Sequence, residues 1–283
     1  MGRWDVTVCG QDGCWPSWFE LTRGRGGLAM RFVSRVGGAR PIQRLEVYGN
    51  ELRFAVPPWM EDPRPDPLFH GRFNGRWFTG TAKDEQGYDL NWSAVRAPAL
   101  ARAGVPRWGA PIELFDGRDL AGWRPRYAGQ PPGWRVQDGL LTAGPGAGDI
   151  LTTRRFRDFR LHVEFRLDRD TDSGIYLRGR HEIQVSNVPG RESESGRNGS
   201  LYSLIPPAAD ALLPPGEWQS YDIALVGRRL TVVLNGTTLI AEQEMPGITG
   251  GALDSDEAAP GPLMLQGFLG QVAFRKLVLT PAR

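Results

Sequence analysis

The chain has 283 residues, enough for two domains of ordinary size, each with its own hydrophobic core. Its 34 Lys+Arg and 32 Asp+Glu are interspersed and leave a formal net charge of +2, so no basic patch indicates nucleic acid or a membrane surface as a partner. Gly at 37 and Pro at 23 are scattered between apolar runs, which favours many short strands over disorder. No apolar run approaches the roughly 20 residues of a membrane span.

The N-terminal part of the chain, residues 1–96, carries short segments in which apolar and polar residues alternate. Leu52-Arg-Phe-Ala-Val56 and Trp77-Phe-Thr-Gly-Thr81 are examples, each bounded by Gly, Asn or Pro. This spacing predicts a small antiparallel β-domain of roughly six to eight strands, either a lipocalin-like half barrel or a small sandwich. A lone His70 in this domain is expected to be structural.

Two cysteines, Cys9 and Cys14, flank Gly-Gln-Asp-Gly and are the only ones in the chain. The residues before and after them read as the two strands of a hairpin, which would place the thiols opposite each other. We therefore expect a disulfide, with free thiols as the alternative, whereas a zinc site would need a second ligand pair. A disulfide favours a periplasmic or secreted protein, although the N-terminus does not itself read as a signal peptide.

The stretch 97–108 is rich in Ala and Pro and lacks strand alternation, so it is predicted to be a linker. Residues 109–283 are then predicted to form a second β-domain, with strand signals from Trp134-Arg-Val136 to the end of the chain. Asn235-Gly236 is the strongest hairpin turn signal in the sequence. Short strands at regular spacing predict an all-β fold, an antiparallel sandwich or barrel.

Alternation sorts the side chains of three strands in this second domain into an apolar and a polar face. The turn between Arg178 and His181 is short enough to pair the last two of these strands directly. If all three strands are neighbours, one sheet face gathers His162, Glu164, Arg166, Tyr176, Arg178, Glu182 and Gln184. A solvated outer face is the plain alternative, but Arg, Tyr and an amide beside carboxylates suit the hydroxyls and the apolar ring face of a sugar.

Other chemistries have little support in the sequence. It contains no G-x-S-x-G elbow, Walker loop or H-E-x-x-H motif, and three His with two Cys exclude a His-rich metal centre. No organic cofactor is predicted, and no pattern fixes an oligomeric state. Alternating Asp168, Asp170 and Asp172 could hold a calcium ion, but the rest of a calcium loop is missing, so a turn with solvated acids is preferred.

Motifs that follow one another in order connect the second domain with a known family. They include Ile112-Glu-Leu-Phe-Asp-Gly-Arg-Asp-Leu-Ala-Gly-Trp123, Ser173-Gly-Ile-Tyr-Leu-Arg-Gly179, Glu182-Ile-Gln184, Leu201-Tyr-Ser-Leu-Ile-Pro-Pro207 and Phe274-Arg-Lys276. Over residues 111–281 the chain resembles the 3-keto-disaccharide hydrolase family. The resemblance implies a concanavalin A-like jelly roll of two packed antiparallel sheets that holds a carbohydrate on a concave sheet face.

The resemblance also implies a substrate, a glycoside already oxidised to a ketone at C3 of its sugar. The ketone acidifies the C2 proton, so that a base can remove it, the C1 leaving group can depart by elimination, and hydration completes a net hydrolysis. Such a site needs a base, an acid, and donors or a cation for the enolate oxygen. In some members of the family a divalent metal, Ca or Mn, is expected in that last role.

Site residues carry over from the family motifs position by position. Glu182 is predicted to be the base or a metal ligand, and Arg178 is predicted to stabilise the enolate. Glu164 is added as a catalytic candidate from strand alternation alone. The candidates for substrate binding are Gln184, Tyr176, His162, Arg166, Gln266, Tyr202 and His181, although alternation turns His181 to the other face.

Three positions depart from the family pattern. Asn187 stands where the family often has Asp, and Gly267 and Phe268 stand where it often has Asp and His. If those groups supply metal ligation or proton transfer, catalysis is lost, and the alternative is a non-catalytic carbohydrate-binding module. A third hypothesis is an interaction protein whose N-terminal β-domain docks a partner or the cell wall.

Overall fold

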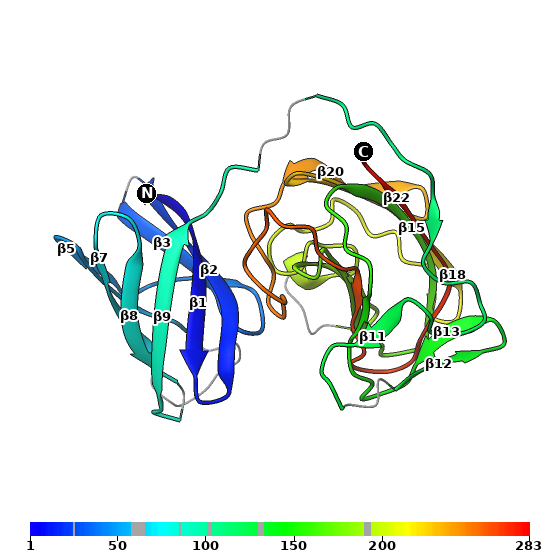
Figure 1. Cartoon of the computed structure of the whole chain (residues 1–283), viewed down its shortest axis with the longest axis horizontal. Coiled ribbons are helices and arrows are strands. Elements are labelled where there is room, and N and C mark those ends of the chain that lie inside the picture. Colours follow the sequence, from blue (N-terminus) through cyan, green and yellow to red (C-terminus); the bar gives the residue numbers. More distant parts are fainter. Residues whose placement is uncertain (25, 58–65, 85, 101–103, 130–132, 190–193) are drawn as a thin grey trace. The chain divides into compact units, whose positions relative to one another are not determined.

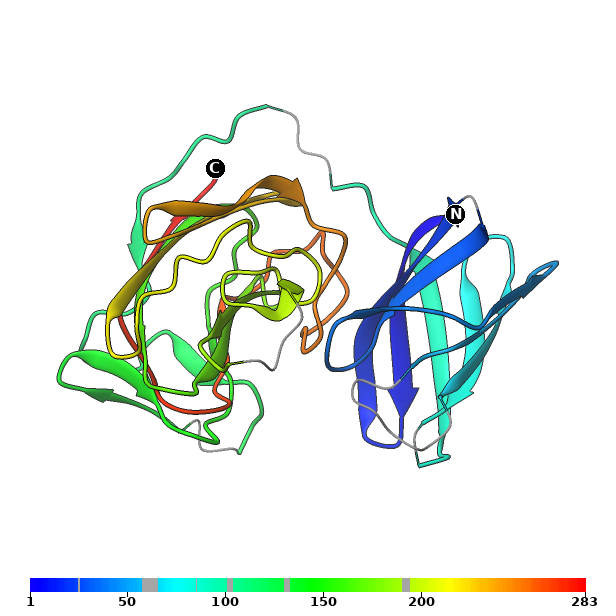
Figure 2. The same ribbon diagram turned by 180° about the vertical axis from the view of Figure 1, so that it is seen from behind.

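The computed structural model describes residues 1–283 except 25, 58–65, 85, 101–103, 130–132 and 190–193. The chain divides into two compact units (Figures 1 and 2): unit 1 comprises Met1–Ala99 and Gly247–Glu257, and unit 2 comprises Leu100–Pro246 and Ala258–Arg283. In the described residues both units consist of strands, with one 3-10 turn, η1, at Glu194–Gly196. None of the helical structure in that part of the chain has the length and apolarity that a membrane crossing requires.

Unit 1 is one antiparallel sheet, in which β9 returns to lie beside β1. The sheet order is β4-β3-β2-β1-β9-β8-β7-β6-β5, and β1, β9, β8 and β7 stand side by side in Figure 1. The sequence predicts roughly six to eight strands in a half barrel or a small sandwich, and the described residues form nine strands in one sheet. Its strands are β1 (Gly2–Gly10), β2 (Gly13–Gly24), β3 (Gly27–Val33), β4 (Ala39–Pro41), β5 (Leu45–Tyr48), β6 (Glu51–Ala55), β7 (Leu68–Phe73), β8 (Phe78–Lys83) and β9 (Asp89–Arg96).

Aromatic side chains fill the interior of the rolled sheet and show how strongly it curls. The ring of Phe32 on β3 lies 5.5 Å from that of Phe54 on β6 and 5.3 Å from that of Phe69 on β7, although these strands are distant in the sheet order. Trp92 reaches across β8 and β7 because both strands carry glycine there. A Cβ at Gly71 would lie 2.3 Å from the Trp92 ring, so a side chain at this position would push the indole out of the core.

The predicted hairpin at the start of the chain is confirmed. Cys9 and Cys14 face each other in the β1–β2 register, with their Cα atoms 4.0 Å apart, and form a disulfide. The bond closes the strand ends around the turn that holds Gln11 and Asp12. The backbone of this turn is therefore fixed from both sides.

The segment Gly247–Glu257 packs on the outer side of β1 and β2 within unit 1. The indole Nε1 of Trp18 donates a hydrogen bond to the carbonyl of Ile248 at 2.7 Å. The guanidinium of Arg3 binds the carboxylate of Glu257, and its Nη2 also lies 3.7 Å from Asp5 Oδ1. All three charged side chains are buried. One cation therefore interacts with two buried carboxylates.

Unit 2 contains two antiparallel sheets. The larger has the order β12-β13-β22-β15-β18-β19-β20, with β10 beside β22, and the smaller has the order β11-β14-β21-β16-β17. The larger sheet consists of β10 (Ile112–Glu113), β12 (Trp134–Gln137), β13 (Leu140–Ala143), β15 (Phe159–Leu167), β18 (Trp218–Val226), β19 (Arg229–Leu234), β20 (Thr237–Glu244) and β22 (Val272–Pro281). The smaller consists of β11 (Trp123–Pro125), β14 (Ile150–Thr152), β16 (Asp172–Leu177), β17 (His181–Ser186) and β21 (Met264–Leu265).

The core of unit 2 lies between these two sheets. The predicted apolar sets supply it: the larger sheet contributes Phe159, Leu161, Val163, Phe165 and Leu167, and the smaller contributes Ile175, Leu177, Ile183 and Val185. Each set occupies every second position of its strand, and in β16 and β17 the residues of the opposite face are buried as well. Two packed antiparallel sheets around one core confirm the predicted concanavalin A-like jelly-roll sandwich.

The turn predicted at Asn235-Gly236 joins β19 and β20. Leu234 pairs with Thr237, so the two residues between them form the whole loop. Asn235 has φ 50° and Gly236 has φ 81°, which is the combination that a type I′ hairpin requires. The Asn235 side chain also accepts a hydrogen bond from the Ser220 amide at 2.8 Å, which ties the turn to β18.

Candidate functional site

The candidate site lies on the face of the smaller sheet that points away from the core. The strand registers align Ile150, Leu265, Ile175 and Ile183 in one row, and all four belong to the core. The adjacent residues of the same strands point the other way, and registers align them as Leu151, Met264, Tyr176 and Glu182. We call this face of β16 and β17 the site face; it carries Asp172, Gly174, Tyr176, Glu182, Gln184 and Ser186.

Glu182 is the central carboxylate of the site face and is only 3% exposed. Its Oε2 accepts a hydrogen bond of 2.8 Å from the hydroxyl of Tyr176, its direct partner across the β16–β17 register. Its Oε1 lies over Gly174, where a Cβ would be only 2.3 Å away. The glycine in the Ser-Gly-Ile-Tyr motif therefore provides the space that the carboxylate occupies.

Tyr176 is buried, and its hydroxyl has a pKa well above the usual value for tyrosine. Burial is the main cause of the higher pKa, and the negative charges of Glu182 and Asp149 add to it, while the charge of Arg126 opposes it. The phenol therefore remains protonated and acts as a donor to Glu182 over the whole range in which proteins are folded.

Arg126 and Asp149 form an ion pair that acts on the site face. The Arg126 Nη1 lies 2.8 Å from Asp149 Oδ2, and the Arg126 amide also donates to the Asp149 carbonyl at 2.8 Å. Both side chains are half-buried, and both charges shift the pKa of Tyr176. The sequence analysis did not identify this pair. Its one available signal was position, because Arg126 directly follows β11 and Asp149 directly precedes β14.

Gln184 follows Glu182 on the same face of β17. Its Nε2 donates to Asp172 Oδ1 at 2.8 Å, which fixes the orientation of the amide. Ser186 comes next on this face and lines a cavity of about 370 Å³ together with Asn187, Arg197, Asn198, Pro207 and Asp210. A cavity of small-molecule size therefore lies at the end of β17, and Ser186 is the site-face residue that lines it.

Two further predicted sugar contacts lie beside the site face. Gln266 follows β21, and its backbone N–H donates to the carbonyl of Gly174 at 2.9 Å, which continues the sheet next to β16. The amide of Tyr202 donates to the carbonyl of Glu182 at 3.0 Å on the other side of β17. Both side chains are half-buried. The backbones of Gln266 and Tyr202 therefore flank the two strands that carry Tyr176, Glu182 and Gln184.

Arg178 in the β16–β17 turn and His181, the first residue of β17, do not belong to the site face. Arg178 has φ 55°, so strand alternation ends before it, and its Nη2 donates to the carbonyl of Gly227 at 2.7 Å. Its buried guanidinium is thus directed at the β18–β19 turn of the other sheet. His181 pairs with Leu177 on the core side and is fully buried, as alternation predicted.

The prediction that β15 is a neighbour of β16 and β17 is wrong. β15 pairs with β18 and β22 in the larger sheet, so its polar residues His162, Glu164 and Arg166 lie on a different sheet from Glu182. Alternation identifies which side chains share a face of one strand, but it does not identify the neighbouring strand. These three candidates are therefore not part of the site face.

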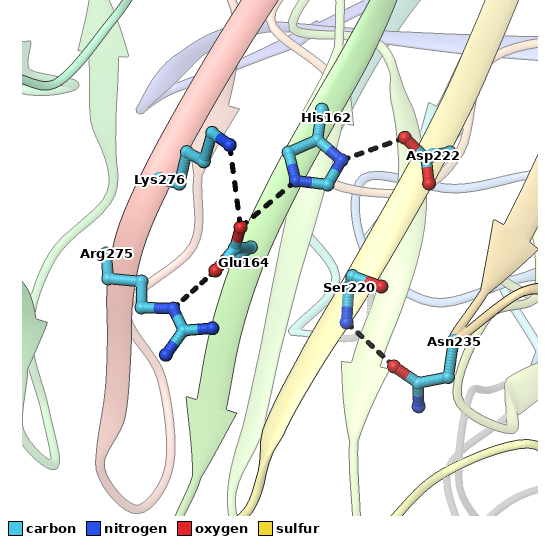
Figure 3. A network of polar contacts seen from close by, with 7 residues as sticks. All are labelled: His162, Glu164, Ser220, Asp222, Asn235, Arg275 and Lys276. Atoms are coloured by element: carbon cyan, nitrogen blue, oxygen red, sulfur yellow. Dashed lines mark hydrogen bonds and ion pairs between the residues drawn. The ribbon is translucent and has the colours of Figure 1, made fainter.

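A polar network on the outer face of the larger sheet accounts for His162 and Glu164 (Figure 3). His162 Nδ1 lies 2.8 Å from Asp222 Oδ1, and His162 Nε2 lies 3.3 Å from Glu164 Oε1. Arg275 Nε donates to Glu164 Oε2, and Lys276 Nζ lies 3.7 Å from Oε1. Two consecutive cations reach one carboxylate because the β15–β22 register shifts between Glu164 and the next residue.

The same network gives Glu164 and Arg166 a structural explanation. Partial burial disfavours the charge on Glu164, but the Arg275 and His162 hydrogen bonds and the nearby positive charges outweigh it, so the pKa of Glu164 lies below its usual value. A carboxyl that ionises this easily is a weak base. The guanidinium of Arg166 lies 5.1 Å from the ring centre of Trp218, which also contacts Arg275 at 4.4 Å.

The residues of the site do not fit a resident divalent metal. Throughout the described ranges, no three or more His, Cys, Asp or Glu side chains are grouped as metal ligands. On the site face, Glu182 accepts from Tyr176 and Asp172 accepts from Gln184, so each carboxylate is already oriented by a protein donor. Asp168 and Asp170 of the alternating acidic run are exposed.

Gly267 and Asn187, two of the positions that depart from the family pattern, have local structural reasons, whereas nothing in the structure explains Phe268. A Cβ at Gly267 would lie 2.6 Å from the carbonyl oxygen of Ala147, so the aspartate often found there has no room in this backbone. Phe268 is 60% exposed, and its carbonyl accepts from the Gly146 amide at 3.1 Å. Asn187 caps the 168–171 turn, because its Oδ1 accepts from the Thr171 amide at 2.8 Å.

Comparisons with known proteins agree with this architecture. Residues 110–280 match the family described as the 3-keto-alpha-glucoside-1,2-lyase-like domain. A curated 3-keto-disaccharide hydrolase of Bacteroides thetaiotaomicron is 26% identical over 193 residues, which are 53% of this chain and 66% of that protein, just under two thirds of its length.

Two solved structures from Parabacteroides distasonis, described as candidate glycosyl hydrolases, are also similar. One is 28% identical with a TM-score of 0.54 and covers 64% of this chain and 93% of its own. The other is 22% identical with a TM-score of 0.51 and covers 60% of this chain and 93% of its own. At this level of identity it supports the fold alone. Because the family match covers more than half of the sequence, the chain belongs to the 3-keto-alpha-glucoside-1,2-lyase-like family of 3-keto-disaccharide hydrolase and glycosyl hydrolase-like proteins.

Proposed function

We propose that the protein cleaves 3-keto-glycosides by removing the C2 proton and eliminating the C1 substituent. The observation that carries this proposal is the buried carboxylate of Glu182, which is held between a tyrosine hydroxyl and a glycine on the site face. A base in such surroundings is poorly solvated and fixed in position, and both properties favour proton transfer from carbon. Family membership supplies the class of substrate.

The proposed reaction balances without an external oxidant or reductant. Glu182 takes the proton from C2, and the electrons of that C–H bond form the enolate of the C3 ketone. The enolate then collapses: the ketone reforms, a C1–C2 double bond appears, and the C1–O bond breaks. The departing oxygen takes the proton from Glu182, and addition of water across the double bond gives the free 3-keto sugar.

The remaining groups of the site support this chemistry in different ways. Tyr176 holds Glu182 in a single orientation through its 2.8 Å hydrogen bond. Arg126 is the cation whose charge acts on Tyr176, and we assign it to the enolate oxygen in place of Arg178, which is directed at Gly227. Gln184 and the cavity beyond Ser186 are proposed to bind the hydroxyls and the leaving half of the substrate.

Incubation with a 3-keto-disaccharide such as 3-keto-maltose tests the proposal, in the presence and absence of Mn²⁺ or Ca²⁺. We expect free 3-keto sugar and, in D₂O, deuterium at C2. Glu182→Gln should lower turnover by a factor of about 100 or more, because it removes the base. Glu164→Gln is the matched control on the other sheet and should retain activity within about twofold. Absence of both product and C2 exchange under every condition would overturn the proposal.

A second candidate function, a non-catalytic carbohydrate-binding module, is favoured by one specific observation. Gly267 packs so closely against Ala147 that the acidic side chain usual at this position cannot be accommodated. If the protein is such a module, calorimetric titration with plain and oxidised disaccharides should show binding, and Gln184→Ala should weaken that binding. Incubation with a 3-keto-disaccharide should then give no product. Absence of binding to any sugar removes this candidate.

We also propose that the protein works in the periplasm or outside the cell. The Cys9–Cys14 disulfide supports this location, because such bonds persist in oxidising compartments. Thiol labelling of the protein in cells of its natural source, with and without prior reduction, tests the proposal. Free thiols before reduction would contradict it.

A further inference from the structure

The rolled sheet of unit 1 contains a cavity at one end. It measures about 490 Å³ and opens among the β1–β2 turn, the segment after β3 and the β8–β9 turn. This volume falls within the range of about 300–1,000 Å³ that is typical of small-molecule sites. The mouth of a β-barrel is also a common position for such sites. The proposed catalytic function does not use this cavity.

The floor and one wall of the cavity are apolar and aromatic. Phe32, Phe69 and Leu90 are buried residues of the unit 1 core that line the floor of the cavity. Trp15 is half-buried at the cavity wall. Gly10 lies between Leu90 and Trp15: a Cβ there would be 2.8 Å from Leu90 and 3.6 Å from the indole. The missing side chain leaves the edge of the indole uncovered there, and the guanidinium of Arg35 lies over the indole ring, 5.4 Å from its centre.

The described residues at the rim of the cavity are largely polar, and their charges balance. The charged side chains among its described lining residues are Asp12, Asp84, Arg35 and Arg40, two of each sign. A fatty acid, a nucleotide or another anion would be recognised by a surplus of cations. Carboxylates and guanidinium groups in equal number beside an indole instead suit a neutral ligand with many hydroxyls and apolar ring faces.

A disulfide on one turn and a pair of hydrogen bonds on another hold parts of the cavity rim in place without a ligand. The Cys9–Cys14 disulfide closes the turn that carries Asp12. Asp84 Oδ1 accepts hydrogen bonds from the backbone amides of Gln86 at 2.9 Å and Tyr88 at 2.8 Å, which holds these three rim residues together. A rim that is ordered in advance loses less conformational entropy on binding, so even a shallow pocket can bind a ligand usefully.

We propose that this cavity is a second carbohydrate site, which binds a neutral gluco-oligosaccharide of two or three units with a sugar ring packed against the Trp15–Arg35 pair. The site would bind glycan independently of the proposed cleavage reaction in unit 2. It gives unit 1 a role of its own, that of holding a glycan chain. The proposal therefore stands or falls separately from the proposed enzymatic function.

The full-length protein labelled with 5-fluorotryptophan provides the test. Fluorine NMR separates the tryptophans, and the Trp15→Phe variant identifies the Trp15 signal. We expect maltotriose, cellotriose or laminaritriose to shift that signal saturably at concentrations up to about 20 mM, well above a Kd of about 1 mM. The signal of Trp77 is the internal control, because Trp77 precedes β8 whereas the cavity residue Asp84 follows it.

Variants then separate binding from folding. Asp12→Ala at the exposed rim should raise the Kd by a factor of about 10, equivalent to about 1.4 kcal/mol, while Trp77→Ala should leave it within about twofold. Glu182→Gln should not change the Trp15 shift, whatever it does to turnover. An unmoved Trp15 signal with all three sugars, or a shift produced by decanoate instead of sugar, would overturn the proposal.

Discussion

The carboxylate of Glu182 occupies the space that a side chain on residue 174 would fill. A Cβ on Gly174 would stand 2.3 Å from Oε1 and 3.0 Å from Cδ of Glu182, too close for any real contact. Tyr176 holds the other carboxylate oxygen at 2.8 Å. The position of the proposed base is therefore set by a missing side chain on one side and a hydrogen-bond donor on the other.

Gly174→Ala is expected to displace Glu182 and to lower kcat by a factor of about 10–100, because misplaced proton-transfer groups lose much of their rate advantage. Steady-state kinetics with a 3-keto-disaccharide measure the effect. Gly144→Ala is the matched control: nothing lies within 4 Å of its added Cβ and its φ is not positive, so kcat should be unchanged. Equal activity of both variants would contradict the role assigned to Gly174.

Tyr176→Phe is expected to move the acid limb of the kcat/KM profile to higher pH. The hydroxyl donates to the ionised form of Glu182, and loss of such a donor raises the pKa of a carboxylate. Because the pKa of Tyr176 itself is raised by burial, its own titration does not enter the profile between pH 4 and 9. A pH–rate profile for each protein checks this, and an unmoved acid limb would show that Tyr176 does not hold the base.

Local sequence signals were sufficient for the β16–β17 half of the site. The four-residue turn and the alternation predict that Tyr176 and Glu182 are paired on one face, and the register confirms it. The Cys9–Cys14 disulfide and the Asn235-Gly236 turn were predictable for the same reason. Each depends on residues a few positions apart, where chain geometry leaves few alternatives.

The parts that sequence reasoning missed depend on contacts between distant segments. His162 pairs with Asp222 and Val278, which are remote in sequence, and nothing in the pattern of β15 indicates these partners. Arg178 lies off the site face for a different reason: its positive φ ends the strand alternation one residue earlier than the polar pattern indicates. Arg126 directly follows β11 and Asp149 directly precedes β14, and these strands of three residues are too short to show a period.

The network around Glu164 should stabilise the fold without contributing to catalysis. Glu164→Gln is expected to lower the free energy of unfolding by less than about 1 kcal/mol, because the pair partners Arg275 and Lys276 are exposed. The pKa of Glu164 is lowered in the folded state, so its contribution is present above the usual glutamate pKa and is lost as the pH falls. Urea unfolding at pH 3 to 7 in low and high salt measures both effects. A large loss of stability at high salt would contradict them.

Asp5 should make the stability of unit 1 decrease as the pH rises. Burial raises its pKa to about 7 despite the charge of Arg3, and the negative charges of Glu257 and Asp256 add to the increase. The folded protein therefore binds a proton that the unfolded chain releases near pH 4, so stability declines between about pH 4 and 7 and is level above that range.

Asp5→Asn should abolish this decline and make unit 1 relatively more stable at pH 8 than at pH 4.5, when each is compared with the wild type. Hydrogen exchange of the β1 and β2 amides at several pH values reports the opening of unit 1 separately from that of unit 2. Asp89→Asn is the control, because Asp89 is an exposed carboxylate that pairs with Lys83 in the same unit. If both variants keep the wild-type pH dependence, Asp5 is ionised in the folded protein and Arg3 serves both carboxylates equally.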